Sequence, residues 1–514
     1  MSRRRALMSV SDKQGLVELG RGLASLGWKL IASGGTGRAL REAGVEVQDV
    51  KDLTGFPEAL GGRVKTLHPA IHAGILAQNS EKDLRELAER GIEPIDLVVV
   101  NLYPFESTVA EPTVSIEEAV EKIDIGGVAL LRAAAKNFER VGVVSDPADY
   151  EAVLSELRER GELNDDTRRR LALAAFRHTA GYDAAISRFL AERDFSRGEG
   201  RFPERLILSA RRLQTLRYGE NPHQEGALYG VGGAQGALGG RLLGGKALSY
   251  NNILDMESAW RAVSSFDEPT VVIVKHGNPC GVASAATLAE AFPPALAGDP
   301  VSAFGSVVCA NRLVDESMAE VIGGLFVEAI LAPGFTPEAE SYLAKHKPNC
   351  RLVDMSATVQ SALPWEVRSV RCGLLLQDQD DCRDDPSTWK VVSQRCPTDD
   401  EQAALEFGWK VVSHVRSNAI VFCGRRAVRG VGAGQMSRVD AVRLASAKAE
   451  EKSKGAVMAS DAFFPFADGV EVAASAGVTA VIQPGGSVRD SEVVAAVDRL
   501  GMAMVFTGRR HFRH

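Results

Sequence analysis

Short apolar runs alternate with helical patterns through the first third of the chain. Ala6–Val10, Trp28–Ala32 and Leu97–Val100 have the length and composition of buried strands. Lys13–Leu26 carries apolar residues at helical spacing, and Arg168–Ala180 predicts a longer helix. Apolar strands separated by helices predict a mostly parallel sheet with helices on both faces, and therefore an α/β fold.

The same patterns continue along the chain. Val45–Val50 and Val141–Val144 are predicted strands, and a helix is expected from Arg38 onward, after the glycine turn Ser33–Gly37. Later strands are predicted at Val271–Val274, Ser306–Cys309, Ala480–Ile482 and Ala503–Phe506, and helices at Ile253–Val263 and Asp440–Ala449. The acidic stretch Gln377–Thr388 is predicted to be a surface loop.

The length of the chain predicts more than one domain. Its 514 residues exceed the roughly 250–300 at which a single hydrophobic core stops growing. The charged, glycine-containing stretch Glu192–Pro203 has the composition of a linker. We therefore expect an N-terminal domain at 1–195 and a larger domain at 200–514.

Charge and cysteine content exclude several classes of protein. Sixty Lys and Arg residues against 67 Asp and Glu give a net charge of −7, which disfavours nucleic-acid binding. No apolar run reaches the ~18 residues of a membrane span, and the first residues lack the apolar core of a signal peptide. The seven cysteines include no C-x-x-C pair, which favours a reducing cytoplasm over a disulfide framework or a zinc site.

Two segments of the first part have the composition of anion sites. Ser33-Gly34-Gly35-Thr36 lies between a predicted strand and a predicted helix, where backbone N–H groups and the helix dipole favour a phosphate. A plain strand–helix turn is the alternative for this segment. Arg63, Lys65 and Thr66 form a second candidate anion site, and a solvated basic loop is the alternative there.

Other polar residues of the first part are candidates for proton transfer or metal binding. Tyr103 follows the apolar strand that ends at 100, Asp124 precedes two glycines, and Lys136 lies among small residues. A tyrosine at the core edge and a surface lysine are the alternatives. His68 and His72 have the spacing of a helical metal pair, but a proline separates them and the general-base glutamate is absent, so zinc is disfavoured.

In the second part, the apolar run Val271–Val274 leads directly into Lys275 and His276, and it breaks at Gly277. Adjacent residues on a regular strand face opposite ways, so both side chains reach one site only if the strand ends here. His276 is then a candidate general base. Cys280 is the alternative as a nucleophile, although no residue near it in the sequence would activate the thiol.

Several further segments are rich in glycine or in hydrogen-bonding side chains. The candidate ligand loops among them are Arg217–Gln224, Lys246–Asn252, Gly430–Arg438, Ser460–Asp468 and Gln483–Asp490. The tail Arg509–His514 has the composition of a basic nucleic-acid arm, but the acidic charge of the whole chain favours a folded tail at an active site.

Together these segments resemble a family of bifunctional purine-biosynthesis enzymes. Its members join phosphoribosylaminoimidazolecarboxamide formyltransferase to inosine monophosphate cyclohydrolase. The resemblance runs in order through almost the whole chain, on the motifs SVSDK, ASGGT, GRVKTLHP, NLYPF, IDIGG, RAAAKN, RYGENPHQ, KALSYNN, VKH with NPCG, SNAI, GAGQMSR, SDAFFPF, QPGGS and RHFRH. Many ordered motifs are far more specific than any one of them.

The resemblance implies a fold for each part. The first would be a methylglyoxal-synthase-like, Rossmann-type domain. The larger part would be α/β as well, with two cytidine-deaminase-like subdomains that divide near 350–390. Zinc deaminases need a P-C-x-x-C motif, which this sequence lacks, so no catalytic metal is implied. The family also implies a cytoplasmic homodimer.

For formyl transfer, the resemblance implies 10-formyltetrahydrofolate as co-substrate, with His276 as base, Lys275 stabilising charge and Asn418 orienting the nucleotide. The nucleotide contacts that it implies are Arg217, Tyr218, His276, Gly305, Glu328, Asn418 and Arg438. The implied folate contacts are Val439, Phe463, Asp468, Ser487, Val488 and Arg510.

For ring closure, the resemblance implies a catalytic set of Lys65, Tyr103, Asp124 and Lys136. The implied nucleotide contacts are Ser11, Asp12, Lys13, Ser33, Gly34, Gly35, Thr36, Arg63, Val64, Lys65, Thr66, Val100, Asn101, Asp124 and Ile125. The glycine turn at Ser33–Thr36 would then hold the 5′-phosphate.

The chain departs from the family pattern at a few positions. Gly277 stands where alanine is expected, Cys372 where a glycine is expected, and Ser306 follows Gly305 in place of a second glycine. Pro293 and Pro294 are predicted to shorten or break the helix that contains them. None of these changes removes a catalytic group. A nucleotide sensor without turnover, or an enzyme with one working half, remain the alternatives.

Overall fold

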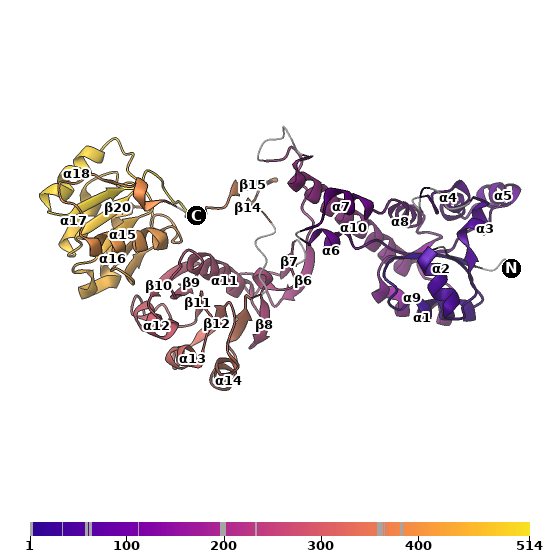
Figure 1. Ribbon diagram of the computed structural model, residues 1–514, viewed down its shortest axis with the longest axis horizontal. Coiled ribbons are helices and arrows are strands. Elements are labelled where there is room, and N and C mark those ends of the chain that lie inside the picture. The colour runs from indigo at the N-terminus through magenta and orange to yellow at the C-terminus, as the bar shows by residue number, and fades with distance from the viewer. Residues whose placement is uncertain are drawn as a thin grey trace. The chain divides into compact units, whose positions relative to one another are not determined.

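The computed structural model describes residues 4–32, 34–56, 60, 64–111, 113–195, 202–231, 234–356, 363, 365–380 and 384–514, with the backbone alone at 194 and 195. The chain forms two compact units, Met1–Ala210 and Arg211–His514 (Figure 1). Among the described residues, none of the helices combines the length and the apolar character that a membrane crossing needs.

The first unit is built on a five-stranded sheet in the order β3-β2-β1-β4-β5. Every pair in it is parallel, as the apolar runs predict. The strands are β1 (Arg5–Val10), β2 (Lys29–Ala32), β3 (Gln48–Asp49), β4 (Leu97–Asn101) and β5 (Gly142–Val144). The chain moves from β1 to β2 on one side and to β4 on the other, so the strand order reverses at β1. In open α/β sheets, ligands bind beyond the carboxyl ends of the strands at such a point.

Helices supply the rest of this unit. They are α1 (Leu16–Ser25), α2 (Gly34–Glu42), α3 (Val50–Thr54), α4 (Pro69–Leu76), α5 (Glu81–Glu89), α6 (Phe105–Val109), α7 (Ile116–Glu121), α8 (Gly126–Lys136), α9 (Tyr150–Arg160) and α10 (Asp165–Leu190). Apolar residues of the strands and of these helices form one buried core. Burying a Leu or Val side chain in such a core contributes about 1.5–3 kcal/mol, which explains why the apolar pattern determines the strands.

Two predictions for this unit were wrong in detail. The glycine segment belongs to α2, which begins at Gly34, although a helix was expected only from Arg38. Val45–Val50 was predicted to be a strand, but β3 holds only Gln48 and Asp49. The Asp49 side chain accepts a hydrogen bond from Lys51 N and starts α3 at Val50, so a helix cap ends this edge strand early.

The described residues of the second unit form two mixed six-stranded sheets and two separate two-stranded sheets. The first sheet has the order β10-β9-β11-β12-β13-β8 and the second has the order β16-β21-β20-β19-β17-β18. The strands are β6 (Arg211–Leu216), β7 (Gly226–Gly230), β8 (Arg241–Gly244), β9 (Thr270–Lys275), β10 (Asn278–Ser284), β11 (Ser306–Ala310), β12 (Val327–Ala332), β13 (Arg351–Asp354), β14 (Trp365–Val370), β15 (Gly373–Asp378), β16 (Lys390–Val391), β17 (Ile420–Cys423), β18 (Val428–Gly432), β19 (Val457–Ser460), β20 (Ala480–Gln483) and β21 (Ala503–Phe506).

Helices cover both faces of the first sheet, with α11 on one side and α12, α13 and α14 on the other (Figure 1). One buried core includes residues of α11 and α15 together with strands of both sheets, and Phe266 and Phe407 meet in it at 5.4 Å. The helices are α11 (Tyr250–Val263), α12 (Leu288–Leu296), α13 (Glu316–Ile322), α14 (Pro337–His346), α15 (Asp399–Val412), α16 (Arg438–Ala449), α17 (Asp468–Ser475) and α18 (Asp490–Arg499).

The two prolines do not break their helix. α12 continues through Pro293 and Pro294 to Leu296. The helix keeps the bond from Ala291 N to Thr287 O and the bond from Ala297 N to Pro293 O. Its buried residues, Phe292 among them, pack into the core of the first sheet. This packing offsets the two hydrogen-bond donors that the prolines remove.

The acidic stretch was predicted as a surface loop, and this was only partly right. β15 reaches Asp378, and Pro386–Thr388 forms a short 3₁₀ turn. The side chain of Asp384 is buried, with 8% exposure. In the β14–β15 hairpin, Cys372 has φ 62°, a left-handed conformation that suits the glycine expected there.

Candidate active sites

The carboxyl ends of β1 and β4 are tied together by Asn101. Its Oδ1 accepts hydrogen bonds from Ser11 N at 2.5 Å and from Asp12 N at 2.9 Å, and its Nδ2 donates to Asp12 O at 3.0 Å. Asn101 is buried, and both ends of its amide are used. These bonds shape the loop that carries Lys13, and the nucleotide contact expected of Asn101 stays a prediction.

Two lysines approach the glycine segment at the start of α2. A Cβ at Gly34 would lie 3.2 Å from Lys65 Nζ, and a Cβ at Gly35 would lie 3.9 Å from Lys13 Nζ. Gly34 has φ 53°, so a side chain there would also be strained. Burial lowers the pKa of Lys13, against the nearby charge of Asp12. Ammonium groups, glycine N–H groups and a helix N-terminus meet here, which is an arrangement that binds anions.

Thr36 has a structural part in this arrangement. Its hydroxyl accepts from Val10 N at 3.0 Å and donates to Val10 O at 3.1 Å, so it joins the first turn of α2 to the end of β1. These bonds hold the hydroxyl to the backbone of Val10, and the phosphate contact expected of Thr36 stays a prediction. Of the predicted contacts in this region, Ser33 and Arg63 lie outside the described residues.

Asp124, at the start of α8, is the centre of a second group. Its Oδ1 accepts from Gly127 N at 2.7 Å, and the backbone N–H of Tyr103 is a further donor to its carboxylate. Burial raises the pKa of Asp124, and these hydrogen bonds oppose the rise. The Tyr103 side chain is half exposed, and Thr66 Oγ1 would lie 3.0 Å from a Cβ at Gly126.

The remaining predicted residues of this unit lie at different places. Val64 is half-buried, Val100 is buried in β4, and Ile125 is 62% exposed beside Asp124. Lys136 is exposed at the other end of α8. At a rise of about 1.5 Å per residue, its backbone lies ~18 Å along the helix from Asp124. Within one unit, the structure therefore does not bring Lys136 to Asp124.

In the second unit, Lys275 and His276 lie at one edge of the first sheet. β9 ends at Lys275, and Lys275 Nζ donates to Gly305 O at 2.8 Å. His276 is exposed and has φ 52°, and Gly277 follows with φ 73°. Asp255 Oδ1 accepts from Gly277 N at 2.6 Å. β9 ends at Lys275, which is the condition for the side chains of Lys275 and His276 to reach one site. Both therefore lie at the same end of the first sheet.

Asn418 lies at the corresponding edge of the second sheet, before β17. Its Oδ1 accepts from Arg438 Nη2 at 2.7 Å, and its Nδ2 donates to Gln435 O at 2.8 Å. Arg438 Nη1 donates to Asp461 Oδ1 at 2.6 Å. Both Arg438 and Asp461 are buried. The guanidinium of Arg438 binds these protein groups and orients Asn418, and the nucleotide contact that the resemblance implies for Arg438 stays a prediction.

The two edges meet. Arg416 N donates to Asn278 Oδ1 at 3.0 Å, and a Cβ at Gly277 would lie 3.3 Å from Arg416 Nη2. Arg416 is exposed and stands two residues before Asn418. A base candidate, two cations and an oriented amide thus lie around one junction, which suits attack on a carbonyl carbon with stabilisation of the resulting charge.

The C-terminal tail is folded against this junction. Ser417 N donates to Arg513 O at 2.8 Å, and His511 N donates to Asp461 O at 3.0 Å. The buried imidazole of His511 pairs with Asp380 at 2.6 Å and with Asp384 at 2.8 Å. The tail is therefore a structural part of the unit.

Most of the folate contacts that the resemblance implies lie on segments that follow the strands of the second sheet. β19, β20 and β21 are parallel, so the segments that follow them meet at one edge of the sheet. These segments hold the exposed or half-buried positions Phe463, Asp468, Ser487, Val488 and Arg510, and the nearby Val439 is half-buried. Glu328 is ion-paired with Arg351, and the guanidinium of Arg217 lies over the Tyr218 ring at 5.6 Å.

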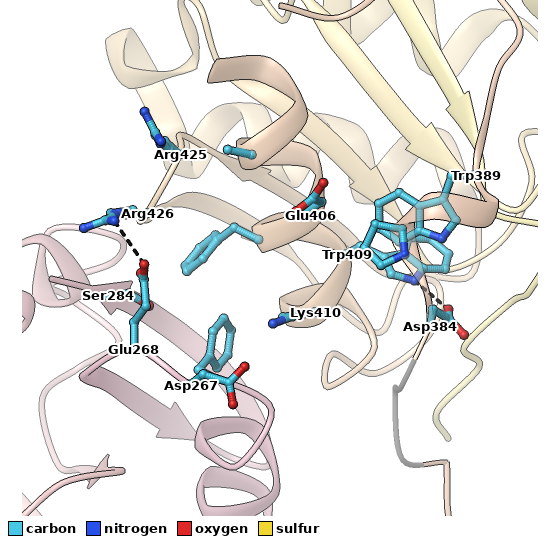
Figure 2. A pocket seen from close by; sticks show the side chains of 14 residues that line it. Asp267, Glu268, Ser284, Asp384, Trp389, Glu406, Trp409, Lys410, Arg425 and Arg426 are labelled. Carbon is cyan, nitrogen blue, oxygen red and sulfur yellow. Dashed lines mark hydrogen bonds and ion pairs between the residues drawn. The ribbon is translucent and has the colours of Figure 1, made fainter. Parts of the chain in front are cut away.

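A cavity of about 400 Å³ lies in this unit (Figure 2). Trp389 and Trp409 line it, together with Lys410, Arg426 and Glu268. Glu268 precedes β9 and Arg426 follows β17, whereas Lys275 ends β9 and Asn418 precedes β17. Glu268 and Arg426 thus lie at the opposite ends of β9 and β17 from the junction, whereas Asp384, which also lines the cavity, pairs with His511 of the tail.

Comparison with known proteins identifies the family. The family described as AICARFT/IMPCHase bienzyme matches residues 134–448, and the MGS-like domain matches residues 15–129. The chain is 52% identical to the bifunctional purine biosynthesis protein PurH of Desulfitobacterium hafniense (strain DSM 10664 / DCB-2), over 99% of this chain and 100% of that protein. This chain belongs to the AICARFT/IMPCHase bienzyme family. It is also 53% identical to PurH of Chloroflexus aurantiacus (strain ATCC 29366 / DSM 635 / J-10-fl), over 99% of this chain and 98% of that protein.

Membership of the AICARFT/IMPCHase family confirms the resemblance read from the motifs and the α/β fold with an MGS-like first domain. Two residues of the second site, Asp255 and Arg416, were not predicted, and Asp461 lies in the predicted ligand loop Ser460–Asp468 without having been singled out. Asp255 stands at helical spacing from Ser258 and Ala262, which are both buried. An acidic residue on a buried helix face is unusual, and this is the sequence signal that could have identified Asp255 as a candidate. Asp461 directly follows a wholly buried strand, which is a comparable signal.

Proposed function

We propose that the chain catalyses the last two steps of inosine monophosphate synthesis, formyl transfer in the second unit and ring closure in the first. The observation that carries this proposal is the junction of Lys275, His276 and Asn418. It stands in a separate unit from the anion-binding glycine segment with Lys13 and Lys65. The names of the relatives, which are called bifunctional and purine-biosynthetic, support the same assignment.

In formyl transfer, the exocyclic amine of aminoimidazole carboxamide ribotide attacks the formyl carbon of 10-formyltetrahydrofolate. This amine is a weak nucleophile because its electron pair is delocalised into the imidazole ring. His276 takes the amine proton as the new C–N bond forms. Lys275 stabilises the charge that develops on the formyl oxygen, and a proton passes to the folate nitrogen as its bond to the formyl carbon breaks. Asn418, held by Arg438, orients the nucleotide.

The alternative nucleophile of this site does not suit the chemistry. Burial raises the pKa of the Cys280 thiol to about 12, so it remains protonated near neutral pH. Its Sγ lies 3.4 Å from Ile273 O, inside the β9–β10 hairpin. The thiol therefore takes no part in the proposed reaction, which needs no covalent intermediate with the enzyme.

In ring closure, the carboxamide nitrogen attacks the new formyl carbon within one molecule, and water leaves. Proximity supplies much of the rate, so the protein has to fold the substrate and move protons. Lys13, Lys65 and the glycine segment hold the 5′-phosphate. Asp124, whose pKa burial raises, exchanges protons with the reacting nitrogen and oxygen, and Tyr103 lies beside it. Lys136 belongs to this set by family resemblance alone.

The co-substrate of the first step is 10-formyltetrahydrofolate, bound at the edge formed by β19, β20 and β21. The exposed rings of Phe463 and Phe466 at this edge suit a flat pterin. We propose in addition a cytoplasmic homodimer. Free thiols at both buried and exposed cysteines favour a reducing compartment.

The test is a reaction of the purified chain with aminoimidazole carboxamide ribotide and 10-formyltetrahydrofolate. Tetrahydrofolate and inosine monophosphate are followed separately, and a parallel reaction starts from the formylated intermediate. Formation of both products is expected. Closure of the intermediate without formyl transfer would leave only the first unit active. Nucleotide binding without either product would favour a sensor instead.

A further inference from the structure

The β9–β10 hairpin turns through two residues only. Lys275 pairs with Asn278, so His276 and Gly277 form the whole loop. Their φ angles are 52° and 73°. Two-residue hairpin loops with both residues at positive φ are favoured by the twist of the strands, and the second position prefers glycine. Gly277 therefore fits the loop, whereas His276 holds a conformation that costs about 1–2 kcal/mol for a residue with a side chain.

The Asp255 carboxylate holds this loop by hydrogen bonds to its backbone. Its Oδ1 accepts from Gly277 N at 2.6 Å, and the N–H of His276 is a second donor to the same carboxylate. Burial raises the pKa of Asp255, while these hydrogen bonds and the charges of His276 and Lys275 oppose the rise. A half-buried carboxylate is costly, and its donors here are the two backbone N–H groups of the strained loop.

Asp255 has a fixed position on α11. Ser249 and Asn252 form a reciprocal capping box that starts this helix. Met256 and Ala259 are fully buried and face the core next to β9. Rotation of α11 would expose this apolar surface. The Asp255 carboxylate is therefore held in contact with the loop at His276 and Gly277.

We propose that Asp255 is a positioning residue for formyl transfer, which holds the backbone of His276 and Gly277 and thereby fixes the direction of the His276 imidazole. The inference rests on the proposed formyl transfer, in which His276 takes the amine proton. A general base must lie within hydrogen-bond reach of that proton. Without the Asp255 hydrogen bonds, the loop backbone would move more freely, and the His276 imidazole would point over a wider range of directions.

The experiment compares Asp255→Ala and Asp255→Asn in the full-length protein. Asp255→Ala removes both acceptors, and kcat for formyl transfer is expected to fall by about 10- to 100-fold, the loss typical of a displaced catalytic group. KM for nucleotide and for folate should stay within about threefold, because no binding contact is removed. Asparagine keeps one acceptor of the same size, so Asp255→Asn should restore part of kcat. Closure of the formylated intermediate should remain at the wild-type rate.

Asp315→Ala is the matched control for lost stability. Asp315 Oδ1 accepts from Met318 N at 2.9 Å and caps α13, so the substitution also removes a carboxylate acceptor of a backbone N–H group. It follows the end of β11 at which Ala310 pairs with Val271, at the opposite edge from Lys275. Its kcat should match the wild type. Equal kcat losses in Asp255→Ala and Asp315→Ala, or a rise in KM alone, would overturn the positioning role.

A second measurement does not depend on turnover. The His276 ring signals in an NMR spectrum, assigned by their disappearance in His276→Ala, should broaden or split in Asp255→Ala and stay sharp in Asp315→Ala. Unchanged His276 signals in Asp255→Ala would contradict the inference. Absence of formyl transfer in the wild-type chain would overturn the proposed function instead, and the ring signals would still decide whether Asp255 holds the loop.

Discussion

Arg438 orients the side-chain amide of Asn418 through a hydrogen bond of 2.7 Å from Nη2 to Oδ1. The other end of that amide donates to Gln435 O at 2.8 Å, so neither rotation nor a flip of the amide is free. Arg438 is itself held by the buried carboxylate of Asp461. A fixed amide near the proposed base His276 suits a reaction governed by substrate orientation.

Replacement of Arg438 by leucine should strongly destabilise the second unit. Asp461 is fully buried, and loss of its partner leaves a buried charge, which costs roughly 3–5 kcal/mol. Urea unfolding followed through tryptophan fluorescence measures the free energy of unfolding. Arg443→Leu is the control, because the Arg443 side chain is 61% exposed and its ion pair with Asp440 should contribute less than about 1 kcal/mol. Similar losses in both variants would contradict the account.

Stability should depend on pH through His511. Burial alone lowers its pKa, but the hydrogen bonds to Asp380 and Asp384 outweigh burial and leave the pKa raised. A base with a raised pKa in the folded state stabilises the fold below its unfolded pKa of about 6.5, and this contribution is lost as pH rises through the folded pKa.

His511→Gln keeps a polar side chain without the charge. The Tm of the wild type should exceed that of His511→Gln most at about pH 6, and the difference should shrink towards about pH 9. Differential scanning calorimetry of both proteins in matched buffers measures it. A difference that is constant with pH, or that grows with pH, would show that His511 carries no charge in the fold.

Gly277→Val should impair formyl transfer beyond its effect on stability. Because the family pattern has alanine at this position, a side chain larger than a methyl group is needed to displace Arg416. The Cβ would lie 3.3 Å from Arg416 Nη2, at a residue with φ 73°. Gly501→Val is the matched control, because Gly501 has φ 69° and open space around it. Both variants should lose about 1–2 kcal/mol of unfolding free energy from backbone strain. Only Gly277→Val should lower kcat for formyl transfer, and equal kcat values in the two variants would refute the contact.

Much of the fold could be predicted because burial on both faces leaves a clear apolar signal. The strands at Leu97–Asn101 and Ala503–Phe506 are such cases. β3 could not be predicted at its true length, because a side-chain cap at Asp49 ends it. The continuation of α12 through Pro293 depends on packing against a distant sheet, which local sequence does not contain.

The candidate sites also combine residues that the local sequence identifies with residues that only tertiary contacts reveal. Lys275 and His276 stand out locally, because a buried strand leads directly into two polar residues. Their partners do not stand out in the sequence: Asp255 lies on α11 and Arg416 in the loop before β17, and only the fold brings them to Gly277. The use of the Thr36 hydroxyl by Val10 is another such tertiary contact. The residue roles at both sites remain predictions.

The central claim is that two reactions take place in two separate units. The most direct test measures formyl transfer and closure of the formylated intermediate in the wild type, His276→Ala and Lys65→Met. His276→Ala should lose formyl transfer and close the intermediate at the wild-type rate, whereas Lys65→Met should lose closure and still release tetrahydrofolate. Loss of both reactions in either variant, with the protein folded, would contradict the division of function between the units.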